Sequence, residues 1–411
     1  MTLHILLFFY LQVNCSELHF TAIEKAAVLC YILNMIEPAE RRGSMTKLRG
    51  VFEGLMKRHI WILSCAVLVA LFHLLKGCRG VMNAVANGAL LVKRLLAMIF
   101  SIIPISMMEL TIAAAVIFGV VYIIIAVRDI VRSEQRLKTA YRRLSFIVAL
   151  VLTVYAAFCV TLNASYYADG FQQKSGLYAK KSSVDELYTV AEYFTRELCE
   201  AYDEVQRDEN GVFAEDIDEI FDRSKGIYDG VIEVYPFLGQ EYVKPKGMIA
   251  SRLMSILNYT GIYFPLSGEA NINVDQPSMM IPATIAHEMA HQRGIASEQE
   301  SNFVEILTCM KSGDPVYRYS GAFSAFVNLG NALYRYDKEA YAYLWYSLPE
   351  EVLADMQANN EYWQQFETKA AEVTEKVYDT FLKSQGQTLG VQSYGACVDL
   401  LIAYYNEYGE F

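Results

Sequence analysis

The sequence predicts a multi-pass membrane protein with three N-terminal transmembrane helices, followed by a mostly α-helical α+β domain. Hydrophobic residues make up 54% of the 411 residues, and their excess over a typical globular domain lies before residue 164. Residues 1–163 hold 17 Lys and Arg against 8 Asp and Glu, net +9, whereas residues 164–411 hold 18 against 38, net −20. The C-terminal part has no run long enough to span a bilayer, and its acids alternate with apolar residues at helical spacing.

Residues 1–44 are an uncertain N-terminal extension. The run LHILLFFYLQV is too short for a full span and lacks the basic leader of a secretory signal. Met45 opens a basic stretch of the kind that precedes a first membrane span. We therefore expect the biological start at Met45, and a peptide from upstream of Met45 in the native protein would contradict this expectation.

The membrane domain, residues 45–163, contains three candidate spans. They lie at about 60–75, 105–127 and 144–162. The loop 128–143 has six basic and two acidic residues, and the positive-inside rule places such a short loop in the cytoplasm. Three spans from a cytoplasmic N-terminus then place residues 164–411 on the extracytoplasmic side.

The connection between the first two spans is ambiguous. Its segment GALLVKRLLAMIFSIIP is apolar but contains Lys93 and Arg94, and charges at mid-membrane are costly. We interpret it as an amphipathic helix in the membrane interface, with a fourth span as the alternative. Together with Lys76 and Arg79, these charges favour the orientation opposite to the one that loop 128–143 indicates.

The charge of the C-terminal domain restricts its partners. An acidic domain does not suit nucleic acid, because phosphate binding requires the opposite sign. It also disfavours adhesion to anionic lipid head groups. The expected partner is the lipid bilayer itself, through the three helices, and the oligomeric state does not follow from the sequence.

The domain is organised around residues 282–302, PATIAHEMAHQRGIASEQESN. In a helix, His287 and His291 stand one turn apart on one face, the spacing at which two imidazoles bind one metal ion. Glu288 lies at the edge of that face, where its carboxylate can reach a metal-bound water, as in zinc peptidases with the HExxH pattern. Pro282 suits the first turn of this helix, and Gly294 suits a left-handed end.

The third ligand must be a carboxylate, because a catalytic zinc takes three protein ligands and residues 164–411 contain no further histidine. Glu298 and Glu300 are the candidates. If a second helix begins near Ser297, which could cap it, Glu298 shares a face with Asn302, and Glu300 points about 200° away. We favour Glu298 as ligand and Asn302 as the residue that steadies the site, and Glu300 remains the alternative.

The rest of the domain is predicted to be helical apart from one hairpin. Residues 261–274, GIYFPLSGEANINV, are rich in β-branched and aromatic residues around a Ser-Gly turn. Residues 183–205, 214–222 and 303–381 have helical spacing. A last helix is expected from Tyr394 to about Tyr408.

Three long segments resemble the domain-of-unknown-function family 3810 of bacterial membrane proteins. They are SRLMSILNYTGIYFPLSGEANINV, IPATIAHEMAHQRGIASEQESNF and QSYGACVDLLIAYY. We expect the resemblance to cover Met45 to the C-terminus. It implies a zincin-like peptidase domain on the outer face of a bacterial plasma membrane, with HEMAH as the zinc motif.

More distantly, the segment EQESN is similar to the E-x-x-x-[DN] element with which glutamate-zincins supply their third ligand, which supports Glu298. The hairpin is similar in placement to their edge strand, which holds an extended peptide, and Glu269 and Asn271 would lie there. The alternative is a hairpin that only packs on the metal helix. Many glutamate-zincins stabilise the oxyanion with a late histidine; this sequence lacks one, so the candidate is the hydroxyl of Tyr394. Asp399 is a candidate acceptor for a histidine N–H, with an ordinary surface acid as the alternative.

The expected function is that of a membrane-anchored zinc metallopeptidase that hydrolyses a peptide or protein substrate, with Glu288 as general base. The alternative is a non-catalytic metal-binding membrane sensor or envelope-assembly protein. The natural substrate and the cleavage specificity do not follow from the sequence.

Overall fold

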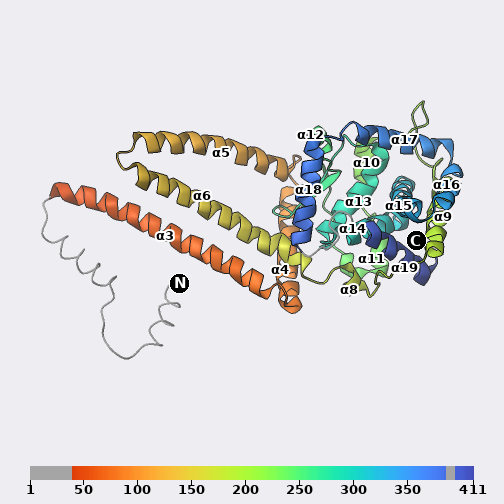
Figure 1. Ribbon diagram of the computed structural model, residues 1–411, viewed down its shortest axis with the longest axis horizontal. Coiled ribbons are helices and arrows are strands. Elements are labelled where there is room, and N and C mark those ends of the chain that lie inside the picture. The colour runs from red at the N-terminus through yellow and green to blue at the C-terminus, as the bar shows by residue number, and fades with distance from the viewer. Residues whose placement is uncertain (1–38, 386–393) are drawn as a thin grey trace.

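The protein is mostly helical, with a small three-stranded sheet beside the helix that carries the two histidines. The computed structural model describes the backbone of residues 39–385 and 394–411, and the side chains of 56–369, 371–385 and 395–411. The predicted N-terminal extension lies, up to residue 38, outside the described residues. Long helices project from one side of a globular part (Figure 1).

Three of the long helices form a bundle. They are α3 (Ala39–Leu75), α5 (Met107–Arg132) and α6 (Arg136–Phe158). Helix α6 packs along α3, where Trp61 Nε1 donates to Thr153 Oγ1 at 2.8 Å. It packs along α5 on its other side, where the Tyr122 hydroxyl donates to the Arg143 carbonyl at 2.7 Å. Most of the large side chains that the bundle exposes are apolar, which is the surface that lipid tails require.

Within the described residues, four helices are long and apolar enough to cross a membrane. They are Met56–Leu75, Arg79–Phe100, Met107–Arg132 and Arg136–Tyr166. Three of them contain the predicted spans. The other is α4 (Arg79–Phe100), the segment that we interpreted as an interfacial helix or a fourth span. Figure 1 shows α4 lying crosswise to the other three, between the bundle and the globular part.

The contacts of α4 explain how an apolar helix carries two adjacent cations. Lys93 is buried and donates to the Thr161 carbonyl at 3.0 Å, and Arg94 donates to Gln240 Oε1 at 3.1 Å. Both charges therefore face protein. The turn before strand β3 docks on the same helix at Gly268, which has φ +74° and whose absent Cβ would lie 2.4 Å from the Lys93 carbonyl oxygen. Only glycine fits such a left-handed close approach.

The core of the globular part is built around α15 (Pro315–Tyr336), which packs on α9 (Val184–Ala201), α13 (Ile281–Gln292) and α14 (Glu298–Lys311). Helix α9 lies within the predicted helical segment 183–205 and begins with a capping box between Ser183 and Glu186. Helix α19 (Tyr394–Tyr408) confirms the predicted last helix. The other elements are η1 (Cys159–Asn163, a π-helical turn), α7 (Ala164–Tyr166), α8 (Phe171–Ser175), α10 (Ile217–Arg223), α11 (Asp229–Val234), η2 (Pro236–Leu238), α12 (Ser251–Ile256), η3 (Ser278–Met280), α16 (Lys338–Tyr346), α17 (Glu350–Gln364) and α18 (Lys369–Ser384).

The predicted hairpin forms the larger part of the sheet. Strand β2 (Gly261–Phe264) pairs antiparallel with β3 (Glu269–Ile272), and β1 (Lys246–Gly247) adds a parallel strand that was not predicted. The strand order is β1-β3-β2, so β3 is central and all of its residues are buried. The prediction that Glu269 and Asn271 lie on a substrate-holding edge strand is therefore wrong. The edge strand of the hairpin is β2.

A buried ion pair fastens the sheet to the membrane helices. Lys246 on β1 pairs with Glu269 on β3, and both side chains are almost fully buried. The ammonium group also donates to the carbonyls of Phe100 and Ile105, at 3.0 and 3.2 Å. The carboxylate accepts from the backbone N–H of Met107 at 2.9 Å. Every charge of this junction has several partners, as buried charges require, and the start of α5 is thereby fixed to the sheet.

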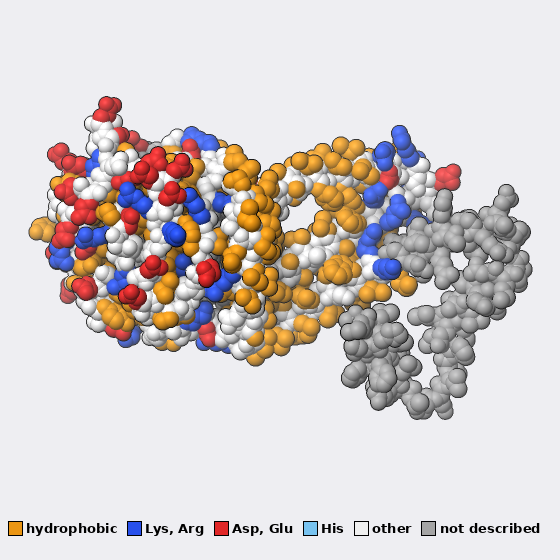
Figure 2. Space-filling model, turned by 180° about the vertical axis from the view of Figure 1, so that it is seen from behind, with side chains coloured by type: hydrophobic (Ala, Val, Ile, Leu, Met, Phe, Trp, Pro, Cys, Tyr) orange, Lys and Arg blue, Asp and Glu red, His pale blue; other side chains and the backbone are white. Residues whose placement is uncertain are grey.

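The charges of the two parts lie at opposite ends of the molecule. Figure 2 shows Lys and Arg side chains gathered at the end of the helix bundle that lies away from the globular part. This end carries the basic segment 128–143. The prediction of a loop over this whole segment is wrong, because α5 continues to Arg132 and α6 begins at Arg136, so only residues 133–135 connect the two helices. The acidic side chains lie mainly on the globular part.

Candidate metal centre

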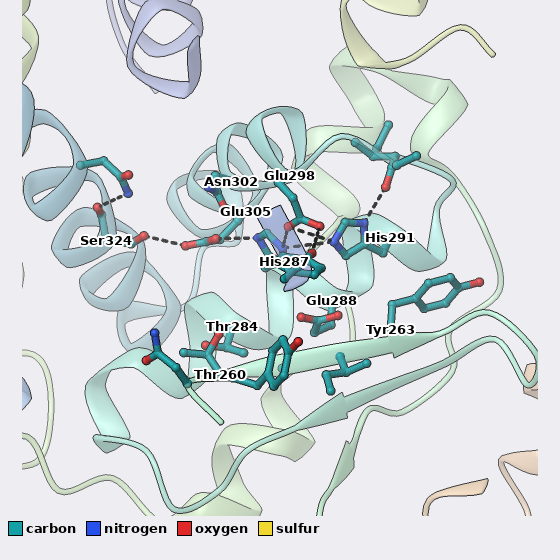
Figure 3. A pocket seen from close by; sticks show the side chains of 18 of the residues that line it. Thr260, Tyr263, Thr284, His287, Glu288, His291, Glu298, Asn302, Glu305 and Ser324 are labelled. Atoms are coloured by element: carbon teal, nitrogen blue, oxygen red, sulfur yellow. Dashed lines mark hydrogen bonds and ion pairs between the residues drawn. The ribbon is translucent and has the colours of Figure 1, made fainter. Parts of the chain in front are cut away.

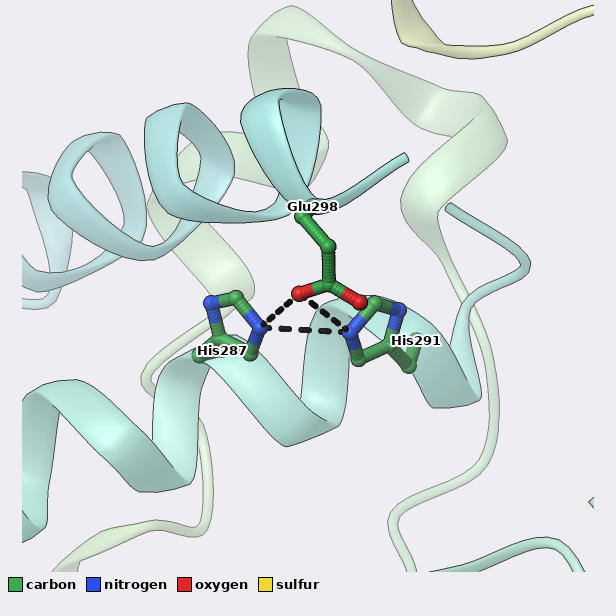
Figure 4. A group of neighbouring side chains, drawn as sticks. All are labelled: His287, His291 and Glu298. Atoms are coloured by element: carbon green, nitrogen blue, oxygen red, sulfur yellow. Dashed lines mark hydrogen bonds and ion pairs between the residues drawn. The ribbon is translucent and has the colours of Figure 1, made fainter. Parts of the chain in front are cut away.

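Helix α13 presents two imidazoles to one point. It begins with Pro282 in its first turn and is followed by Gly294 at φ +87°, as the sequence predicted. Ile281, Ile285 and Met289 are buried in the core. This leaves the face with His287 and His291 toward an open cleft, where their Nε2 atoms lie 3.2 Å apart (Figure 4).

Helix α14 brings a carboxylate to the same point. Glu298 Oε2 lies 3.3 Å from His287 Nε2 and 3.7 Å from His291 Nε2. Among the described residues, these three form the candidate group of metal ligands, with all ligand atoms within 4.8 Å of one another. Ligands about 2.05 Å from a tetrahedral zinc ion are separated by about 3.3 Å. The measured separations therefore fit a zinc ion at the centre of the group.

The outer nitrogens of both rings have partners that fix the ring orientation. His287 Nδ1 lies 3.2 Å from Glu305 Oε2, and Glu305 Oε1 accepts from the Ser324 hydroxyl at 2.7 Å (Figure 3). His291 Nδ1 lies 2.7 Å from the Ile295 carbonyl oxygen. A carboxylate and a carbonyl only accept hydrogen bonds, so each neutral ring carries its hydrogen on Nδ1. The lone pairs of both Nε2 atoms are then free for a metal.

The site is electronegative. Burial opposes a charged imidazole, but hydrogen bonds to Glu298 and Glu305 raise the pKa of His287 well above its ordinary value. Burial alone would raise the pKa of Glu298, but the two histidines hold that pKa well below its usual range. The centre therefore retains an ionised carboxylate, which attracts a cation.

Glu288 occupies the gap between α13 and the edge strand. It is 5% exposed, and burial raises the pKa of its carboxyl group. A Cβ on Gly261 of β2 would lie 2.6 Å from Glu288 Oε1, so the glycine makes room for the carboxylate. Within the described part of the chain, Glu288 Oε2 has no hydrogen-bond partner. A buried carboxylate oxygen without a partner is costly in a folded protein and suggests a functional role.

Tyr378 on α18 approaches the centre from the opposite side of the cleft. Its hydroxyl donates to Glu298 Oε1 at 2.6 Å, and its ring packs on that of Tyr259 with centroids 6.0 Å apart. Burial raises the pKa of Tyr378 well above its ordinary value, so the hydroxyl remains a donor. Glu298 thus faces the histidines with Oε2, and the hydrogen bond at its other oxygen, Oε1, fixes the orientation of the carboxylate.

The centre opens into a cleft of ≈ 1190 Å³. One wall is the edge strand with Thr260 and Tyr263, and the opposite wall includes Asn328 and Arg335 of α15. A cleft of this size accommodates several residues of an extended peptide or a comparable small molecule.

The sequence matches the family described as "Protein of unknown function (DUF3810)" over residues 90–402. The chain belongs to the DUF3810 family. The match begins inside α4, which is later than the expected start at Met45, and it includes every residue of the candidate centre. No curated protein and no solved structure matches the chain.

The other residues predicted for the site of this DUF3810 protein lie in different places. Asn302 lines the cleft, but it is Tyr378 of α18 that donates to Glu298, and Glu305 that lies beside His287 Nδ1. Glu300 is buried away from the histidines and accepts from the backbone N–H groups of Phe171 and Gln172, at 2.6 and 3.2 Å. It anchors the start of α8 and is not positioned as a ligand.

Two predictions concerned the last helix. Asp399 accepts from the Ser182 hydroxyl at 3.2 Å, whereas both histidine Nδ1 atoms have other partners. The prediction that Asp399 accepts from a histidine is therefore wrong. The side chain of Tyr394 lies outside the described residues, although helix α19 begins at that position.

Proposed function

We propose that this DUF3810 protein is a membrane-anchored, zinc-dependent metallopeptidase with a zincin-like domain. The observation that carries the proposal is the unpartnered oxygen of Glu288, which is buried beside three converging ligand atoms at a cleft. A structural zinc site is closed by four protein ligands, whereas here three ligand residues converge and Glu288 stands beside them outside the group. A hydrolase needs such a base.

The residues have separate tasks in this proposal. His287, His291 and Glu298 hold the zinc ion, which supplies Lewis acidity to the scissile carbonyl and to a water molecule. Glu288 takes a proton from the attacking water and delivers it to the leaving amine. The Tyr378 hydroxyl donates to Glu298 and so keeps this ligand in its orientation. The oxyanion donor suggested by the sequence, Tyr394, stays a prediction.

The membrane topology belongs to the same proposal. Helices α3, α5 and α6 cross a bacterial plasma membrane, and α4 lies in its outer interface. The support for this is the crosswise position of α4 and the inward-facing contacts of Lys93 and Arg94. Because these two cations are bound by protein, they do not oppose an extracytoplasmic domain as free loop charges would.

The test combines metal analysis with turnover in the full-length protein. The purified wild type is expected to hold one zinc ion per chain and to cleave peptides from a random library, read by mass spectrometry. Glu288→Gln should retain zinc and lose cleavage, whereas His287→Ala should lose both. Glu233→Gln is the matched control, because Glu233 is exposed on α11 and lies outside the cleft.

The alternative function, a metal-binding sensor or assembly protein, predicts a different result. Stoichiometric zinc with no cleavage by the wild type would favour it. Cleavage that persists in Glu288→Gln would show that the proposed base is wrong.

A further inference from the structure

An apolar surface surrounds the place where the helix bundle meets the globular part. Figure 2 shows hydrophobic side chains forming a band there. Three elements expose large apolar residues beside this junction: α4, the segment at the start of α12, and α18. We call the following set the rim: Leu91, Leu95 and Ile99 of α4, Ile249 and Leu253 at α12, and Val373 and Val377 of α18, each at least 53% exposed.

The rim continues the apolar surface of the membrane helices. The backbone N–H of Ala250 donates to Glu109 in the first turn of α5, at 2.7 Å. At the other end, the Tyr167 hydroxyl lies 3.5 Å from the Ser384 carbonyl oxygen of α18. The rim elements are therefore joined directly to the ends of helices whose exposed residues are suited to lipid. The lipid that surrounds those helices therefore reaches the rim. The apolar side chains of the rim are then covered by the interfacial region of the bilayer.

Helix α18 also forms part of a wall of the cleft with its other face. On α18, Thr374 and Tyr378 line the cleft, while Val373 and Val377 are exposed on the outside. The end of the last membrane helix contributes Ser165 and Tyr166 to the cleft. The candidate metal centre is thus separated from the proposed lipid surface by about one helix diameter, roughly 10 Å.

We propose that the substrate is a membrane-anchored polypeptide, cleaved in the stretch next to its membrane anchor. This inference rests on the peptidase activity proposed above and adds the class of substrate. A chain that emerges from the bilayer beside the rim enters the cleft within a few residues, since an extended chain advances about 3.3 Å per residue. A soluble chain enters the same cleft only after losing its freedom of translation, which an anchored chain has already lost in part.

The first experiment tests whether the rim is in the bilayer, independently of catalysis. Full-length protein is reconstituted in phosphatidylethanolamine and phosphatidylglycerol vesicles that contain spin-labelled lipid, with a fluorophore attached at Val377→Cys, at Leu253→Cys or, as a control, at Tyr346→Cys on α16. Tyr346 is 83% exposed, and its helix α16 lies on the side of the globular part away from the bundle (Figure 1). Quenching at the two rim positions but not at the control is expected. No quenching at the rim, or cross-linking of Val377→Cys between two copies, would overturn the proposal.

The second experiment tests the class of substrate. Vesicles carrying the protein receive a random peptide library, either free or attached to a lipid anchor through spacers of 0, 5, 10 and 20 residues. We expect at least tenfold faster cleavage of the anchored library, at positions that stay at a fixed distance from the anchor as the spacer lengthens. A soluble endopeptidase tethered to the same vesicles controls for surface concentration and should show no fixed distance.

Variants connect the two experiments. Ile249→Ser with Leu253→Ser should reduce cleavage of the anchored library and leave zinc content and free-peptide cleavage unchanged, whereas Tyr346→Ser should change none of these. Equal cleavage of free and anchored libraries would overturn the substrate class while the peptidase proposal stands. Absence of all cleavage would overturn both, and the quenching result would still report whether the rim lies in the bilayer.

Discussion

The assignment of Glu298 rather than Glu300 as a ligand leads to opposite consequences for two matched substitutions. Glu298→Gln keeps the size of the side chain and an acceptor for the Tyr378 hydroxyl but removes the carboxylate that faces the histidines. Glu300→Gln places an amide NH2 against backbone donors, the N–H groups of Phe171 and Gln172. Each hydrogen bond to a charged group contributes about 1.5–3 kcal/mol. We therefore expect Glu300→Gln to be destabilised by about that amount in the metal-free state.

Thermal unfolding of the full-length protein in detergent measures both effects. For a domain of this size, 1 kcal/mol corresponds to about 2–4 °C, so Glu300→Gln should melt about 3–12 °C below the wild type. Zinc at 100 times its dissociation constant stabilises the wild type by about 2.7 kcal/mol. That zinc-dependent increase should persist in Glu300→Gln and disappear in Glu298→Gln. If Glu298→Gln keeps the increase and Glu300→Gln loses it, the ligand assignment is wrong.

Other predictions follow from single contacts. Glu305→Gln should weaken zinc binding by about 10–100-fold, because the substitution removes the charged acceptor of His287 Nδ1. Competition with a chelating dye measures the affinity, and an unchanged affinity would show that Glu305 does not have this role. Gly261→Ala should lower turnover with zinc retained, because its Cβ would meet Glu288. Gly119→Ala on α5 serves as control, because among the described residues its Cβ would meet nothing within 4 Å and it lies outside the cleft. Protease added to intact spheroplasts should digest residues 164–411 and spare segment 128–143, and protection of the domain would place it in the cytoplasm.

The parts of the centre that the sequence predicted are those that local geometry determines. His287 and His291 meet because residues four apart are neighbours on any helix. Glu298 joins them after a short turn at Gly294, whose left-handed conformation was also predictable. Glu305 was missed although it lies seven residues after Glu298 on the same helical face. Extending the helical-wheel argument by one turn would have found it.

Tertiary contacts determined the features that the sequence did not reveal. Tyr378 is 80 residues from Glu298 and is one of 29 tyrosines, so no local signal distinguished it. Strand β1 has two residues, too few for a periodic pattern. The central position of β3 follows from this unpredicted strand, and it overturned the expected role of Glu269 and Asn271.

The ion pair of Lys246 and Glu269 has a consequence for any form of the protein that is released from the membrane. A fragment that begins at residue 164 would lose the Phe100 and Ile105 carbonyls and the Met107 N–H as partners of these buried charges. Each hydrogen bond to a charged group contributes about 1.5–3 kcal/mol, which is a sizeable share of the total stability of about 5–15 kcal/mol of a typical domain. Release by proteolysis would therefore destabilise the domain as well as detach it from the membrane, and a lower melting temperature of the released fragment would show this.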